Sequence, residues 1–190
     1  MSQIFIDKNY KTVSFTNTPL PNGEYDQCTF IDCNFSEQHL SHNVFLECTF
    51  LDCNMTNVKF GGTTLNDCTF TNCKLLGANF SVCNSFMLRV RFRENILDLT
   101  QFNNLDLKNT QFINCSLKQA DFTETDLTSS LFSNCKLHGA LFEKTILNKA
   151  DFRTAIDYHI NPTQNQLKGA LFSENNLRGL VQDLGIKVFN

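Results

Sequence analysis

A bulky side chain recurs at every fifth position through most of this sequence. The series begins at Phe5, runs to Phe80, and resumes two residues out of step at Met87 before continuing to Phe152. Of the 19 Phe residues, 17 lie on this grid when Phe172 is counted. A helix repeats every 3.6 residues and a strand every 2, so neither regular element explains a period of five. The pattern predicts a repeat fold built from many short, similar units.

A small or short residue stands two positions before most of the bulky ones. Cys, Ala, Thr and Ser dominate this position, as in CTFIDC at 28–33, CTFLDC at 48–53 and CTFTNC at 68–73, which follow one another at intervals of 20 residues. That interval holds four of the five-residue units. Four short extended sides joined by corners would close a square, so we expect a four-sided β-helix in which residues one lap apart stack along the axis.

The columns formed at this interval separate Phe from Leu. One column contains only phenylalanine, namely Phe30, Phe50, Phe70, Phe92, Phe112, Phe132 and Phe152. A second is nearly all phenylalanine, namely Leu40, Phe60, Phe80, Phe102, Phe122 and Phe142. The other two columns are mostly leucine, and we assign Met87 to the column that contains Leu65 and Leu107. Such sorting is expected if each column forms one side of a buried core.

The slip at 81–86 is predicted to be a two-residue bulge at a corner of the coil. An insertion there leaves the columns intact on either side, and Phe86 falls off the grid, so we expect its ring to be exposed. The bulge is either a tolerated insertion or a loop that contacts a partner. The candidate loop residues are Val82, Cys83, Asn84, Ser85 and Phe86.

The unit (Ala/Cys/Thr/Ser)-x-(Phe/Leu)-x-x resembles that of the pentapeptide-repeat family over roughly residues 5–155. The resemblance implies an all-β fold, a right-handed quadrilateral parallel β-helix, and we add a short C-terminal α-helical cap. We therefore divide the chain into a β-helix over 1–156, with a small bulge near 81–86, and a capping or dimerisation segment over 157–190.

The C-terminal segment contains a helical pattern. NNLRGLVQDLG at 175–185 predicts one short helix, with Asn175 or Asn176 as its N-cap and Gly185 as its end. An open solenoid end needs a cap, which here either covers only its own chain or also forms a two-fold dimer. The candidate dimerisation residues are Leu177, Leu180, Val181 and Leu184 on one helix face, followed by Ile186, Val188 and Phe189 in a short strand.

This segment narrows the resemblance within the family. LKGALF at 167–172, followed by GLVQDLGIKV, resembles the C-terminal sequences of proteins in the quinolone-resistance branch. The stretch INPTQNQL resembles part of a microcin-immunity protein of the same family. The resemblance implies a homodimer joined through the C-termini and a rod that acts on DNA gyrase. This chain lacks the long projecting loops of some quinolone-resistance members, so branches without such loops, which inhibit or shield gyrase, are the closer comparison.

The charge pattern supplies a candidate surface for a partner. The net charge of −3 does not indicate electrostatic binding to nucleic acid, and residues 1–80 carry eight Asp and Glu against four Lys. The charges are either ordinary solvated groups or an acidic stripe that competes with DNA for a basic groove. The candidate acidic residues are Asp32, Asp52, Glu47, Asp67, Asp106 and Asp126.

Residues for catalysis or for binding a metal or cofactor are not arranged together in the sequence. Eight of the nine Cys occupy the small position and predict buried free thiols, and the four His are scattered, so we expect no enzyme activity, metal or cofactor. No apolar run is long enough to span a membrane, and a secretory signal is not indicated, so we expect a cytoplasmic protein.

Two functions remain open from the sequence. The first is a non-enzymatic DNA mimic that binds DNA gyrase or topoisomerase IV and protects it from quinolones or from topoisomerase-poisoning toxins. The second is a structural or scaffolding module with a different protein partner. Weak net charge and the absence of long loops favour the second, whereas the acidic first half and the C-terminal resemblance favour the first.

Overall fold

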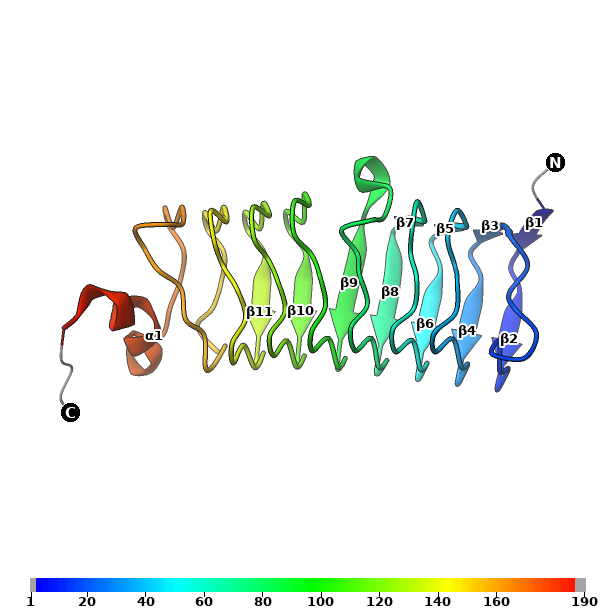
Figure 1. The fold of residues 1–190 in the computed structure, drawn as a ribbon, viewed down its shortest axis with the longest axis horizontal. Coiled ribbons are helices and arrows are strands. Elements are labelled where there is room, and N and C mark those ends of the chain that lie inside the picture. The colour runs from blue at the N-terminus through cyan, green and yellow to red at the C-terminus, as the bar shows by residue number, and fades with distance from the viewer. Residues whose placement is uncertain (1–2, 187–190) are drawn as a thin grey trace.

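The computed structural model describes residues 3–186 and has the form of an elongated four-sided β-helix (Figure 1). All strand pairs are parallel, and each strand pairs with the strand one lap away, as in Phe30↔Phe50 and Phe112↔Phe132. Isolated bridges such as Asn34↔Asn54 link the coils on the sides that lack regular strands. The predicted all-β parallel β-helix is confirmed.

The strands form two sheets on neighbouring sides of the rod. The four-stranded sheet has the order β1-β3-β5-β7 and contains β1 (Gln3–Ile6), β3 (Gly23–Asp26), β5 (Val44–Leu46) and β7 (Thr64–Asn66). The seven-stranded sheet has the order β11-β10-β9-β8-β6-β4-β2. It contains β2 (Asn9–Lys11), β4 (Thr29–Ile31), β6 (Thr49–Leu51), β8 (Cys68–Thr71), β9 (Val90–Arg93), β10 (Gln111–Ile113) and β11 (Leu131–Ser133).

Most corners of the coil are made by one residue in the left-handed backbone conformation. This residue stands two positions after the bulky one, with φ of 51° at Asp32, 57° at Asp52 and 66° at Gly62. Short polar residues and glycine tolerate this conformation best, which explains why Asn, Asp and Gly recur at the corners. One extended side plus one such corner accounts for the period of five residues.

The predicted columns form the core. The ring centroids of Phe30 and Phe50 lie 4.9 Å apart with the rings 7° from parallel, and Phe112 and Phe132 stack in the same way. Rings on adjacent sides meet edge to face, as Phe112 and Phe122 do at 5.9 Å and 84°. Both arrangements are favourable for aromatic pairs, so the interior is filled along the whole axis.

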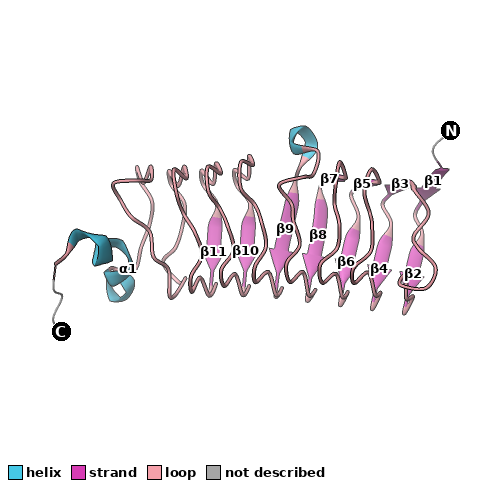
Figure 2. Cartoon of the chain, in the orientation of Figure 1, coloured by secondary structure: helices cyan, strands magenta, loops and turns pink. Residues whose placement is uncertain are grey.

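The bulge differs from its prediction in two details. Phe86 is 95% exposed, as expected, and stands on a 3₁₀ turn, Ser85–Met87, that projects from the rod (Figure 2). Met87 was assigned to a core column, but it is 37% exposed and Leu88 is buried instead. Cys83, one of the candidate loop residues, is buried and so is not available to a partner. The inserted residues bend outward. The Arg89 amide then donates to Leu65 O at 2.9 Å, and the aligned pairing of the coils resumes at Cys68↔Val90.

The winding continues beyond residue 156. A bridge joins Asp151 to Leu171, and the ring of Phe172 stacks on that of Phe152 with centroids 5.3 Å apart. LKGALF at 167–172 therefore returns to the 20-residue grid, as its sequence predicts. The division of the chain at residue 156 stays a prediction.

A short helical cap follows the last coil, at the end opposite β1 (Figure 1). It has three pieces rather than the single helix predicted: a 3₁₀ turn (Glu174–Asn176), α1 (Arg178–Val181) and a second 3₁₀ turn (Gln182–Leu184). Gly185, with φ of 66°, ends it as predicted. The predicted N-caps are wrong, because no side-chain cap hydrogen bond is present and the Asn176 amide group instead donates to Ala155 O at 3.2 Å.

Close packing explains why the helix is interrupted. Gly179 lies so near the backbone and ring of Tyr158 that a β-carbon would collide with both, and its carbonyl accepts from the Ile160 amide at 2.9 Å. None of the helices within residues 3–186 has the length and apolar character needed to cross a membrane.

Candidate functional site

The candidate acidic residues Asp32, Asp52, Glu47 and Asp67 occupy corners of the coil. Each has a positive φ, between 51° and 57°, and each side chain is directed away from the filled core. Asp32 and Asp52 follow strands β4 and β6, whereas Glu47 and Asp67 precede β6 and β8. The four carboxylates therefore lie along the two long edges of one flat side of the rod.

The corner that carries Asp32 and Asp52 remains anionic. The next residue along this corner is Asn72, whose side-chain amide donates to Asp52 Oδ1 at 2.7 Å. Within residues 3–186, no Lys, Arg or His approaches either carboxylate within 4.0 Å, and the same holds for Glu47. These three carboxylates keep their charge unpaired, and their role as a partner-binding surface stays a prediction.

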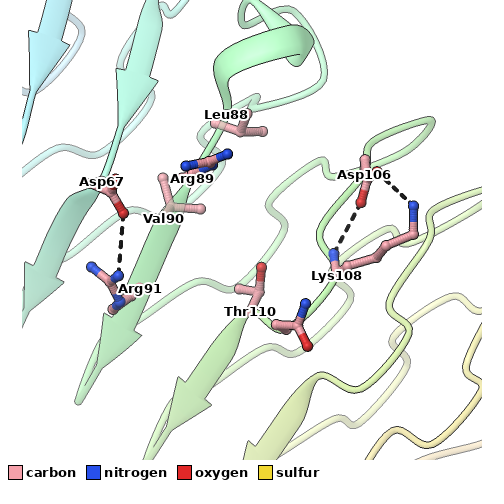
Figure 3. Close-up of a pocket in the computed structure, with 9 residues that line it drawn as sticks. Asp67, Leu88, Arg89, Val90, Arg91, Asp106, Lys108 and Thr110 are labelled. Atoms are coloured by element: carbon pink, nitrogen blue, oxygen red, sulfur yellow. Dashed lines mark hydrogen bonds and ion pairs between the residues drawn. The ribbon is translucent and has the colours of Figure 1, made fainter.

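Asp67, Asp106 and Asp126 are instead paired with cations. Arg91 lies 3.2 Å from Asp67, and the Lys108 ammonium lies 2.8 Å from Asp106 (Figure 3). The same ammonium lies 3.3 Å from Asp126. The predicted alignment of Asp106 with Asp126 is present as a bridge between adjacent coils. This part of the surface is consequently close to neutral and does not continue the anionic corner.

The environment of Asp126 is the most organised of the six. Partial burial alone would raise the pKa of its carboxyl, but hydrogen bonds from Thr128 and Lys108 outweigh burial and hold that pKa below its usual value. The Thr128 hydroxyl donates at 2.6 Å and its amide at 3.0 Å. Hydrogen bonds and ion pairs with Asp106 and Asp126 raise the pKa of Lys108. The group is therefore fixed in its charged form near neutral pH.

A shallow hollow lies between these ion pairs and the bulge. It is lined by charged and polar groups that include Asp67, Arg89, Arg91, Asp106 and Lys108 (Figure 3). A second hollow shares Arg89, Asp106 and Lys108 with the first and adds Phe86 from the turn. The structure thus brings the candidate loop together with Asp106, while Asp32 and Asp52 lie at a different corner.

The cations of this region were missed by the sequence reasoning. Lys108 follows Asp106 by two positions and Asp126 follows Asp106 by 20, so the lap length alone predicts that one ammonium can reach both carboxylates. Arg91 was not predicted to be the partner of Asp67. Their separation of 24 residues crosses the insertion, so no regular spacing points to it.

The candidate dimerisation residues are only partly available at the surface. Leu177, Leu184 and Ile186 are exposed, whereas Leu180 packs against the core. Val181 is also partly buried. Val188 and Phe189 lie outside the described residues. The exposed members are apolar residues of the capped end, and the dimer itself stays a prediction.

Thiols and histidines show no arrangement for chemistry. All nine Cys are buried, as the eight at the small position were expected to be, and burial raises the pKa of Cys48 and Cys83 to about 12. His159 pairs with Asp183 at 2.9 Å and ties the cap to the last coil. Among the described residues, no group of three or more potential ligands is placed to hold a metal ion.

Comparison with known proteins gives a family and a set of similar folds. A family model described as a pentapeptide repeat region matches residues 23–102 and 105–181. A search of curated proteins found no match. A trypsin-treated variant of QnrB1, a plasmid-mediated fluoroquinolone resistance protein, is a similar solved structure, with a TM-score of 0.62, 14% identity and coverage of 97% of this chain and 100% of that one.

A second similar structure is HetL from the cyanobacterium Nostoc sp. strain PCC 7120, a pentapeptide repeat protein involved in the regulation of heterocyst differentiation. Its TM-score is 0.62 at 18% identity, with coverage of 94% of this chain and 88% of that one. At these identities the two structures establish a shared fold only.

Proposed function

Because this chain belongs to the pentapeptide-repeat family, we propose that it is a non-enzymatic DNA mimic that binds a type II topoisomerase, DNA gyrase or topoisomerase IV. By occupying the groove that holds DNA, it protects the enzyme from quinolones or from toxins that poison it. The proposal places the protein in the cytoplasm as a homodimer joined through its C-terminus, without a cofactor and without direct contact to nucleic acid.

The main support is the anionic corner of a rigid rod. Asp32 and Asp52 project from consecutive coils, with Glu47 on the neighbouring corner, and no cation of the described chain neutralises them. Coils repeat about every 4.8 Å, so the nine stacked rings from Tyr10 to Phe172 span about 38 Å. A filled core leaves only the outer faces for recognition, which is what a protein-binding rod requires.

The amount of charge limits how the mimicry works. Two chains carry a net charge of twice −3, or −6. Duplex DNA of comparable length, about 75 Å, carries roughly 40 charges. Bulk charge therefore cannot reproduce DNA, and the proposal depends on shape together with a few local carboxylates that meet a basic groove.

The proposal is tested with purified gyrase. We expect the protein at micromolar concentration to reduce quinolone-induced DNA cleavage or to inhibit supercoiling. The variant Asp32→Asn/Asp52→Asn should weaken this effect about 3–10-fold, since complementary charges chiefly accelerate association. A matched control, Glu143→Gln/Glu174→Gln, removes the same charge from exposed sites in the C-terminal part. If the parent protein alters neither reaction, the topoisomerase proposal is wrong.

The alternative of a scaffold for another protein has its own support. Arg91 and Lys108 form ion pairs with Asp67, Asp106 and Asp126, and Phe86 projects beside them, so this region suits a mixed apolar and polar protein contact more than a DNA-binding groove. Cross-linking at the bulge should then trap a non-topoisomerase partner that excess duplex DNA does not displace. Displacement by DNA would favour the first function.

A further inference from the structure

The outer face of the seven-stranded sheet changes character along the rod. Figure 1 shows its strands side by side on one flat side. On β4, β6 and β8 the outward residues carry no charge, and we call them the aliphatic–threonine strip: Thr29, Ile31, Thr49, Leu51, Thr69 and Thr71. On the adjacent strands β2 and β9 the aligned residues include Lys11 and Arg93. A cation therefore lies beyond each end of the strip along the rod axis.

The strip has unused binding capacity. All six of its side chains are partly exposed. Within residues 3–186, no hydrogen bond engages the hydroxyls of Thr29, Thr49 or Thr69. The strands are held rigidly by pairing on both sides, Thr29↔Thr49↔Thr69. A flat, preorganised face with free hydroxyls and two aliphatic side chains can bind a partner without first being ordered.

Carboxylates border the strip along both of its long edges. Asp32 and Asp52 follow β4 and β6, and Glu47 precedes β6, all three without a cation partner among the described residues. Glu47 and Asp52 are five positions apart in the chain, a separation of at most about 17 Å when extended, which is within reach of one short peptide segment. The carboxylates along these edges repel a phosphate backbone. They favour a ligand that carries cations on both sides of an apolar centre.

We propose that the aliphatic–threonine strip is the docking centre for a cationic protein segment that carries aliphatic side chains between flanking Lys or Arg residues. The aliphatic side chains pack on Ile31 and Leu51, and the cations pair with Asp32, Asp52 and Glu47. This inference rests on the proposed role as a protein-binding rod and specifies its contact face. It differs from mimicry by charge, because the apolar centre supplies most of the affinity.

The test uses a synthetic nine-residue peptide of alternating Lys and Leu, with a Lys/Ser peptide of equal charge as its control. Amide NMR signals of the full-length labelled protein should shift on β4, β6 and β8 when the Lys/Leu peptide is added. The Lys/Ser peptide should bind at least 10-fold more weakly. Equal affinity for both peptides, or shifts centred on another face, would overturn the proposal.

Matched variants separate the strip from its surroundings. Leu51→Lys should weaken peptide binding at least 10-fold, whereas Ile113→Lys, at the equivalent outward position of β10, should leave it unchanged. Asp32→Asn/Asp52→Asn should weaken it about 3–10-fold at low salt and less at high salt. Circular dichroism confirms that each variant is folded, and Leu51→Ser replaces Leu51→Lys if the latter does not fold. Unchanged binding by the folded Leu51 variant would contradict the proposal.

The same variants distinguish this inference from the topoisomerase proposal. If the Lys/Leu peptide binds at the strip while the parent protein does not affect gyrase, the strip inference stands and the topoisomerase proposal fails. If gyrase responds equally to the parent protein and to the folded Leu51 variant, the topoisomerase proposal stands and the strip inference fails.

Discussion

At the scale of single residues, the corners impose the strongest local requirement. Among residues 3–186, twenty-three non-glycine residues have a positive φ, and Leu99, with φ of 60°, is the only aliphatic one of these. A side chain in this conformation crowds its own backbone, at a cost of about 1–2 kcal/mol that Asn partly avoids. Leu99 is 52% exposed, so it recovers little of that cost by burial.

Leu99→Asn should therefore stabilise the protein. We expect the free energy of unfolding to rise by about 0.5–1 kcal/mol, measured by urea denaturation. The reverse exchange at an equivalent corner, Asn104→Leu, where φ is 61°, should lower it by a similar amount. Loss of stability in Leu99→Asn would mean that the leucine makes a contact that outweighs its backbone strain.

The small position also has a specific chemical role. The Cys48 thiol donates to Tyr25 O at 3.2 Å, and the Thr125 hydroxyl donates to Phe102 O at 2.7 Å, in both cases to the bulky residue 23 positions earlier. Cys, Thr and Ser can make this bond and Ala cannot, which explains why polar small residues are common inside the rod. Burial raises the pKa of the Cys48 thiol to about 12, so this thiol stays protonated near neutral pH.

Stability should consequently fall in alkaline solution. Burial raises the pKa of Cys48 and Cys83 to about 12 in the folded chain, whereas unfolded thiols have a pKa of about 8.5. The contribution of these two thiols to the free energy of unfolding is complete below pH 8.5. It is lost as the pH rises towards 12, because in this range only the unfolded chain releases the thiol protons. Each such thiol should reduce the free energy of unfolding by about 1.4 kcal/mol per pH unit in this range.

Urea denaturation between pH 7 and 10, in the presence of a reductant, measures this loss. The variant Cys48→Ala/Cys83→Ala serves as the control. Its free energy of unfolding should fall less steeply with pH, and the difference between the two slopes should correspond to up to two protons per molecule. The same slope in parent and variant would show that these thiols do not contribute to the alkaline loss.

At the scale of the elements, a residue's contribution to the free energy of unfolding depends on whether its side chain lies in a column that faces the axis of the rod. Phe112 is fully buried and stacks on Phe92 and Phe132, whereas Phe86 on the projecting turn is 95% exposed. Phe112→Ala should lower the free energy of unfolding by about 3–5 kcal/mol. Phe86→Ala, its matched control, should change it by less than about 0.5 kcal/mol. A loss below 1 kcal/mol for Phe112→Ala would contradict a packed column.

The elements also show how far sequence reasoning extends. The coil, its columns and the exposed ring of Phe86 follow from a period of five that no other regular structure satisfies. The sequence does not predict which residue re-enters the core after the insertion. Leu88 is buried there rather than Met87, because the hydrogen bond from the Arg89 amide to Leu65 O sets the position of the chain. The candidate carboxylates were identified from their positions along the coil, but the pairing of Asp67 with Arg91 depends on side-chain reach across the insertion.

At the scale of the whole molecule, the two ends of the rod differ. The first coil ends in the edge strands β1 and β2, with Ile4 and Ile6 exposed, whereas the last coil is covered by the helical cap. The cap leaves Leu177, Leu184 and Ile186 exposed on a surface of its own. An apolar surface at the end of a rod is suited to a two-fold contact, in which each apolar residue meets the same region of its partner.

Replacement of exposed cap residues by charged ones tests this dimer. Leu184→Glu/Ile186→Glu should convert a dimer into a monomer by light scattering, because two buried carboxylates on each side of a two-fold contact would be desolvated and would repel each other. These positions are preferable to Leu180, which packs against the core, so that a charge there would also disturb the cap.

Ile4→Glu/Ile6→Glu, at the opposite end, is the matched control and should leave the mass of a dimer unchanged. X-ray scattering adds a second measurement, since two rods of about 38 Å joined at their caps reach a maximum dimension of about 80 Å or more, against about half of that for one chain. A monomeric parent at tens of micromolar, or a dimer that only the Ile4→Glu/Ile6→Glu variant disrupts, would place the contact elsewhere or remove it. The proposed gyrase complex would then have to be formed by a single rod, with half the length over which it can imitate DNA.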